Sequence, residues 1–141
     1  MLLGTYEHTL DVKNRIVIPS RLTEELHGKL YLYPAITVSC IKVYNKTEWD
    51  KFSEMIFSLP QDIQYNVRHM ILPFSLEIVP DSQNRVPLTQ GMLDKAKITD
   101  REIYFIGMGE YCEIWNRKLY DAQAAQRADE ETTDYIRKLG L

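Results

Sequence analysis

The five-residue motif Asp-x-x-Asn-Arg occurs twice in the chain and constrains its fold more than any other feature. The copies occupy residues 11–15 and 81–85, 70 residues apart. When residues 7–16 are aligned with residues 77–86, Glu, Asp, Asn and Arg are identical at four positions. A repeated motif with matching flanks indicates that one short unit has been duplicated within the chain.

A second pair of matching segments follows the two motifs at nearly the same distance. Residues 44–50 align with residues 115–121 at an offset of 71. An aromatic residue, Asn, a base, a second aromatic residue and Asp recur there in the same order. Because both ends of the unit match in register, duplication explains the pattern better than chance does.

Each half has the residue pattern of a strand, a turn, a short helix and two further strands. The motif favours a turn, because Asp bonds to nearby backbone and Asn tolerates a left-handed conformation. In the first half Ser20 is the expected N-cap of a short helix that ends at Gly28. Expected strands are 16–18, 30–33 and 37–44, then 78–79, 85–88, 103–108 and 111–115, with a second short helix at 92–97.

Two helices are predicted between the halves and one after them. The pattern Thr47-x-x-Asp50 resembles a capping box at the start of the first, and Pro60 ends that helix. The second linking helix ends before Pro73, and an amphipathic helix is expected over about residues 118–139. The predicted units are residues 5–47, linking helices 48–73, residues 76–119 and a C-terminal helix 120–141.

Composition and charge exclude several classes of protein. The start of the chain turns polar by Glu7, unlike a signal peptide, so a cytoplasmic location is expected. Cys40 and Cys112 stand alone in apolar sequence, which is typical of reduced, buried thiols. The three histidines form no metal spacing or catalytic triad. We therefore predict neither an enzyme nor a membrane protein, and no metal, cofactor or small-molecule substrate.

The two motifs and their context resemble the MraZ family of bacterial transcription regulators, which carry two tandem AbrB-like units. The resemblance covers nearly the whole chain. It rests on Gly4-x-Tyr6 with residues 11–19, on residues 81–86, and on Ile-Gly-Met-Gly at 106–109 followed by Glu-Ile-Trp at 113–115. The family usually has Gly before the Arg, where this chain has Asn14 and Asn84. Both residue types accept a positive φ, so the turn is expected to survive.

The resemblance implies an α+β, mainly β fold: a tandem AbrB-like swapped-hairpin, double-split β-barrel with linking helices and a C-terminal helix. It also implies a ring of several identical subunits that binds double-stranded DNA. The implied targets are repeated short boxes in the promoter of the division and cell-wall gene cluster. On this basis we expect a sequence-specific repressor associated with the nucleoid.

Candidate DNA-binding residues are Lys13, Asn14, Arg15, Arg21 and Arg85, and the residues that build the turns are Asp11, Asp81 and Asn84. Arg15 can contact guanine or clamp a phosphate, and Lys13 adds a compact charge beside it. The alternative for Arg15, left open by the sequence, is an intramolecular ion pair with Asp11. A structural role is favoured for Arg85, because residues 82–83 are Ser-Gln where residues 12–13 are Val-Lys.

The net charge of −3 argues against strong nucleic-acid binding by a single subunit. The acidity is concentrated in residues 121–141, with five acids and three bases, whereas residues 11–21 are locally basic. A ring that presents several basic tips to several boxes would gain affinity by effective concentration. The alternative function is an AbrB-like protein-interaction or scaffold module that does not bind DNA.

Overall fold

The computed structural model describes all residues from 1 to 141. The strands are β1 (Thr5–Thr9), β2 (Arg15–Val17), β3 (Leu30–Pro34), β4 (Ile41–Asn45), β5 (Leu76–Ile78), β6 (Arg85–Pro87), β7 (Glu102–Gly107) and β8 (Cys112–Asn116). The α-helices are α1 (Lys46–Phe57), α2 (Gln61–Ile71), α3 (Gln90–Lys95), α4 (Arg117–Ala122), α5 (Ala124–Arg127) and α6 (Glu130–Leu139). Two 3₁₀ turns complete the fold, η1 (Ser20–Leu22) and η2 (Leu72–Phe74).

Six strands form one antiparallel sheet in which the two halves exchange strands. The order is β1-β7-β8-β4-β3-β5. β1 of the first half pairs with β7 of the second, with His8 opposite Ile103. β5 of the second half pairs with β3 of the first, with Ile78 opposite Leu30. Each half therefore contributes its first strand to the hairpin of the other half.

The two remaining strands, β2 and β6, form a separate ribbon in which Ile16 lies opposite Val86. Matching hydrogen bonds extend the ribbon at both ends. The N–H of Ile18 donates to the carbonyl of Asn84, and the N–H of Leu88 donates to the carbonyl of Asn14, both at 2.9 Å. This reciprocity is that of a pseudo-twofold axis through the ribbon, as duplication predicts.

The α+β, mainly antiparallel architecture was predicted, but the strands do not close into one hydrogen-bonded barrel. β1 and β5 are the edges of the six-stranded sheet, and β2 and β6 pair only with each other. The ribbon strands have three residues each. β6 ends in Pro87, and Pro19 closely follows β2. Proline has no N–H, so neither Pro19 nor Pro87 can donate a ladder hydrogen bond.

One core of 20 buried residues joins the ribbon to the sheet and draws on both halves. Ile16 and Val86 of the ribbon and Ile103 and Phe105 of β7 are fully buried. Burying a side chain of this size stabilises a fold by about 1.5–3 kcal/mol. Separating the halves would expose this core, so the two halves fold as one unit.

The prediction of buried, structural cysteines is confirmed. Cys40 and Cys112 are free thiols with no exposed surface. Burial raises the pKa of Cys112 to about 12 and raises that of Cys40 as well. Both side chains therefore stay protonated near neutral pH and are poor nucleophiles.

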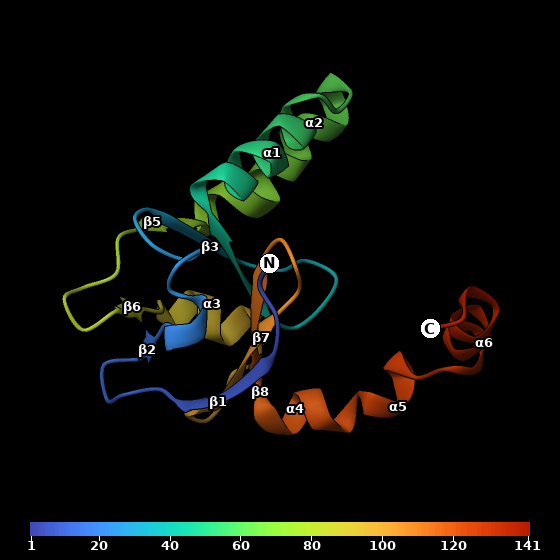
Figure 1. Cartoon of the computed structure of the whole chain (residues 1–141). Helices are drawn as coiled ribbons and strands as arrows, with labels where there is room; N and C mark the ends of the chain where they lie inside the picture. Colours follow the sequence, from blue (N-terminus) through green and yellow to red (C-terminus); the bar gives the residue numbers. More distant parts are fainter.

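The helices α1 and α2 form a hairpin that stands out from one end of the molecule (Figure 1). Its base is held by stacked aromatic rings, such as Tyr31 on Trp49 at 5.1 Å between ring centroids. The predicted capping box at Thr47 is wrong, because β4 runs directly into α1. The cap is Asn45, whose Oδ1 accepts from the N–H of Glu48 at 2.9 Å. Asn116, its counterpart in the second half, caps α4 in the same way.

The C-terminal region is three short helices rather than the single helix predicted over 118–139. The path bends at Gln123 and again at Ala128, where the backbone leaves helical geometry. Asp129 then starts α6 by accepting from the N–H of Thr132 at 2.7 Å. No residue of α6 is buried, and the helix projects away from the sheet (Figure 1).

Two further sequence predictions were wrong in detail. Ser20 is not an N-cap: Pro19 precedes a single 3₁₀ turn that has no side-chain cap. The strand predicted over 37–44 begins only at Ile41, because residues 37–40 are a series of bends. Gly28, the predicted stop after the short helix, does have a positive φ of 66°.

Replacing Gly107 by Ala should destabilise the protein. A Cβ at this position would lie 2.6 Å from backbone atoms of Leu2 and Leu3, which are held by the hydrogen-bonded bridge from Leu2 to Gly109. We expect the free energy of unfolding, measured in urea, to fall by about 1–3 kcal/mol. Gly91→Ala is the matched control, because nothing lies nearer than 4.0 Å and alanine favours the helix. Equal stability of the two variants would contradict the close approach.

Candidate nucleic-acid interface

Asp11 organises the first loop, residues 10–14, which joins β1 to β2. Its Oδ1 accepts hydrogen bonds from the backbone N–H groups of Lys13 and Arg15, both at 2.9 Å. Its Oδ2 accepts from Nε of Arg15 at 2.6 Å. Asn14 has a φ of 56°, the left-handed conformation predicted for it. The motif therefore closes the turn through Asp, reverses the chain at Asn and fixes the following Arg.

The second loop, residues 79–84, has the same geometry. Asp81 accepts from the N–H groups of Gln83 and Arg85 at 2.9 Å, and from Nε of Arg85 at 2.9 Å. Asn84 has a φ of 59°. The roles predicted for both Asp residues and for Asn84 in building the turns agree with this geometry.

The intramolecular ion pair that was one alternative for Arg15 is thus present in both loops. It uses only Nε of each guanidinium, and the two terminal nitrogens make no hydrogen bond. The side chains of Arg15 and Arg85 remain 26% and 24% exposed. Since a guanidinium has five N–H donors in a planar fork, the pair orients each arginine and leaves its outer donors for another acceptor.

The same contacts keep both carboxylates ionised. The backbone N–H of Arg15, followed by its side chain, lowers the pKa of Asp11 below its ordinary value of 3.8. Arg85 does the same to the pKa of Asp81. Near pH 7 both members of each Asp–Arg pair are ionised, and their opposite charges cancel. The net charge of each loop is then set by the residues between Asp and Asn.

The two loops differ in that charge. Position 13 is an exposed Lys that makes no ion pair, whereas its counterpart at position 83 is Gln. Val12 likewise corresponds to Ser82. Only the first loop therefore has a free positive charge beside its oriented arginine.

The loops also differ in how their Asn side chains are held. Nδ2 of Asn84 donates across the halves to the carbonyl of Ile18 at 3.2 Å and to Oγ1 of Thr23 at 3.1 Å. The counterpart of Thr23 is Leu93, which cannot accept a hydrogen bond, and the carboxamide of Asn14 makes none. The sequence analysis did not single out Thr23, although aligning it with Leu93 shows the difference.

The structure brings most of the predicted residues to one side of the molecule. Both loops project from the same side, away from α6 (Figure 1). Lys13, Asn14 and Arg15 lie together in the first loop, and Arg85 lies opposite Val17 in the ribbon. Arg21 is on η1, exposed and without a hydrogen bond or ion pair.

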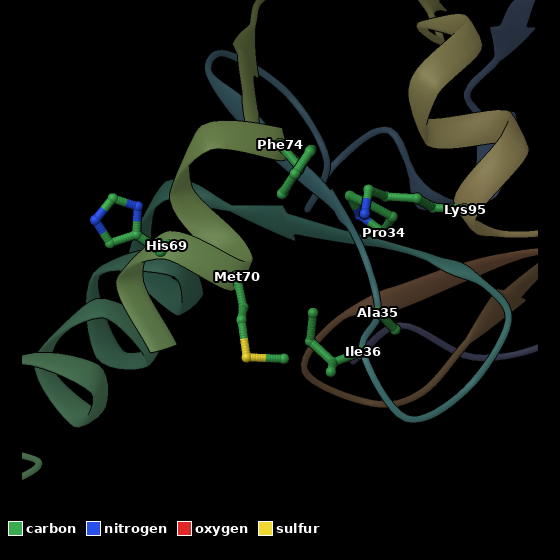
Figure 2. A pocket seen from close by; sticks show the side chains of 7 residues that line it. All are labelled: Pro34, Ala35, Ile36, His69, Met70, Phe74 and Lys95. Atoms are coloured by element: carbon green, nitrogen blue, oxygen red, sulfur yellow. The ribbon is translucent and has the colours of Figure 1, made fainter. Parts of the chain in front are cut away.

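A hollow of about 350 Å³ lies away from the two loops, where α2, β3 and α3 approach one another (Figure 2). Met70 reaches from α2 toward Ile36, and Lys95 extends from α3 over the ring of Phe74, 4.0 Å from its centre. Pro34 and Ala35 complete the apolar wall. This hollow contains none of the candidate DNA-binding residues.

Comparison with known sequences identifies the family. The profile described as "MraZ protein, putative antitoxin-like" matches residues 1–64 and again residues 75–138. The chain belongs to the MraZ family. The double match agrees with the duplication inferred from the two motifs.

Curated MraZ relatives cover most of the chain. The "Transcriptional regulator MraZ" of Carboxydothermus hydrogenoformans is 34% identical over 139 residues, 95% of each chain. The protein of the same name from Clostridium acetobutylicum is 36% identical over 121 residues, 84% of this chain and 83% of its own. That of Thermoanaerobacter pseudethanolicus is 29% identical over the full length of both. These names are of regulators and agree with the prediction that the chain is not an enzyme.

Two further observations concern other classes of site. No helix combines the length and apolarity that a membrane span requires. No three His, Cys, Asp or Glu side chains gather in a way that could hold a metal ion.

Acid should weaken the two loops. A carboxyl whose pKa is lowered by folding stabilises the folded state fully above its unfolded pKa, and this stabilisation is lost as the pH falls through the folded value. We expect the urea midpoint of Asp11→Asn, relative to the wild type, to be lower at neutral pH. The difference should shrink as the pH falls below 3.8. A difference that is constant with pH would contradict a stabilising role for the ionised carboxylate.

The Asn84 contact should be measurable with a matched pair of variants. Asn84→Gly keeps the positive φ and removes two hydrogen bonds, whereas Asn14→Gly keeps the positive φ and removes none. We expect Asn84→Gly to lower the free energy of unfolding by about 1 kcal/mol more than Asn14→Gly does. Equal effects in urea unfolding would show that the contact does not join the halves.

Proposed function

We propose that this MraZ protein is a DNA-binding transcriptional regulator that contacts double-stranded DNA through its first loop. The observation that carries the proposal is the arrangement of Lys13, Asn14 and Arg15. Their outer donors are unpaired, and they lie on a turn fixed by Asp11. Arg is suited to guanine or phosphate, Asn to adenine, and Lys to the phosphate backbone. The names of the MraZ relatives support the same function.

The second loop has the lesser role in this proposal. Arg85 is oriented as Arg15 is, but it has Gln83 beside it instead of Lys, and Asn84 is engaged across the ribbon. A contact by Arg85 would therefore lack a cation within its own loop, and the nearby Arg21 comes from η1 of the first half. We assign to the second loop chiefly the support of the first, because the carbonyl of Asn84 binds the strand that carries Arg15.

We propose further that each half is an AbrB-like unit, residues 5–47 and 76–119, completed by the other. The exchange of β1 and β5 between the halves and the reciprocal ribbon support this division. In such an arrangement one chain supplies both of the equivalent units that two identical chains would supply in a dimer. The two loops are then the equivalent tips of a pseudo-dimer.

Assembly into a ring is supported by apolar surface that the chain does not cover. Exposed large side chains on the helical hairpin and on α6 are Met55, Phe57, Ile63, Tyr65, Met70, Tyr135, Ile136 and Leu139. Stable subunit contacts bury about 1,200–2,000 Å² of accessible surface in total. The hollow between α2 and α3 adds apolar wall beside the base of the helical hairpin (Figure 2).

A ring would also bind DNA more tightly than one weakly charged first loop can. Each tip has one free lysine and one arginine already paired with Asp11. Several tips on several repeated promoter boxes would act at a high effective concentration. We propose that these boxes lie upstream of the division and cell-wall gene cluster, that binding represses it, and that the protein resides at the nucleoid.

Arg15→Ala and Arg85→Ala form the matched test. Each removes one Asp–Arg pair, so their effects on the loops should be similar, whereas only Arg15 is assigned to DNA. On DNA from upstream of the protein's own gene, we expect Arg15→Ala to lower affinity about 10- to 100-fold. Arg85→Ala should have a smaller effect. Fluorescence anisotropy measures the affinity, and sedimentation checks that both variants assemble as the wild type does.

Two results would overturn the assignment. One is an unchanged affinity of Arg15→Ala, and the other is an equal loss in both variants. If the wild type ignores this DNA and binds a protein partner instead, the alternative of an interaction module is favoured.

A further inference from the structure

A second hollow lies beside Asn84 of the second loop, between β1, the ribbon and η1. It measures about 510 Å³, and its lining residues are Tyr6, His8, Val17, Ile18, Pro19, Ser20, Arg21 and Asn84. Arg21 is its cation and makes no ion pair or hydrogen bond in the chain. Ser20 and His8 can add neutral hydrogen-bond donors, and neither side chain donates to another residue.

The duplication provides an internal comparison for this hollow. The related hollow in the second half is lined by Leu76, Thr89 and Gly91, the counterparts of Tyr6, Pro19 and Arg21. It measures only about 160 Å³, and Pro73 and Phe74 also line it. The counterpart of His8 is Ile78. The hollow of the first half is therefore the larger one and contains a cation, Arg21, where the second half has Gly91.

Packing alone does not explain this difference. Arg21 is exposed and unpaired, and His8 is only half-buried. Neither side chain packs into the core as Ile78, the counterpart of His8, does. Burial lowers the pKa of His8, so its ring is neutral near pH 7 and still offers one N–H. A cation with adjacent hydroxyl and ring donors is the combination that binds phosphate oxygens.

We infer that this hollow is a phosphate-binding subsite, with Arg21 supplying the charge and Ser20 and His8 the neutral hydrogen bonds. For its DNA-bound form the inference rests on the proposed function. The shared ligand chemistry is a phosphate group, from either a DNA backbone or a free phosphorylated molecule.

The position of the subsite suits a backbone phosphate. Arg21 follows Arg15 by six residues, so their α-carbons lie no more than about 20 Å apart. Successive phosphates of one DNA strand are spaced about 3.4 Å along the helix axis, so one duplex can reach both residues. The first loop would then contact base edges while the hollow holds the backbone and fixes the register.

Arg21→Gln tests the subsite on DNA, with Lys118→Gln as the control for loss of one positive charge. Lys118 is exposed on α4 and makes no ion pair. We expect Arg21→Gln to lower DNA affinity and to reduce the slope of log affinity against log salt by about one per contacting subunit. Lys118→Gln should leave the slope unchanged. His8→Ile, which installs the residue of the second half, should lower the affinity without a change of slope.

Inorganic phosphate tests the subsite without DNA. Thermal unfolding is measured in phosphate and in chloride at equal ionic strength, and the stabilisation by phosphate should be smaller in Arg21→Gln than in Lys118→Gln. An effect of Arg21→Gln on the salt slope assigns the subsite to DNA. An effect on phosphate stabilisation with an unchanged slope assigns it to a free phosphorylated ligand.

The two proposals can fail separately. If the wild type does not bind DNA, the proposed function fails and the phosphate measurement still tests the subsite. If Arg21→Gln matches Lys118→Gln in both measurements while Arg15→Ala loses DNA affinity, the subsite is overturned and the proposed function stands.

Discussion

The pairing of strands from one half with strands from the other is the constraint on which the rest of the structure depends. β1 completes the second hairpin, β5 completes the first, and β2 pairs only with β6. The 20-residue core exists only when these pairs are formed. Both motif loops begin and end on exchanged strands or on the ribbon, so their geometry depends on the association of the two halves.

In the proposed function, the motif combines a structural and a binding role in the same residues. Asp11 closes the turn and also holds Nε of Arg15, so the contact that stabilises the loop also aims the guanidinium. Ion pairing and binding of a ligand are therefore not exclusive for this arginine. Nε of Arg15 is held by Asp11, and its two terminal nitrogens are the atoms that can contact a ligand.

The halves have kept one backbone plan and diverged in charge. Lys13 corresponds to Gln83, Arg21 to Gly91 and His8 to Ile78. The cationic or polar member of each of these pairs is in the first half. In the second half the Asn84 side chain is bound by Thr23 of the first half, and the related hollow is smaller. At these positions the first half is the more cationic one, in a chain whose net charge is −3.

The sequence by itself determined the duplication, the two turns and the positive φ of Asn14 and Asn84, because these follow from local backbone chemistry and from repetition. It also indicated most strands and both linking helices. It did not determine that the strands divide into a six-stranded sheet and a separate ribbon, which Asn caps α1, or where the C-terminal helix breaks, since these depend on neighbouring segments. Only the tertiary structure decided that Asn84 is engaged by Thr23 while Asn14 is free, and that His8 and Arg21 share one hollow. Contacts between residues distant in sequence form when the halves exchange strands, and no local pattern specifies them.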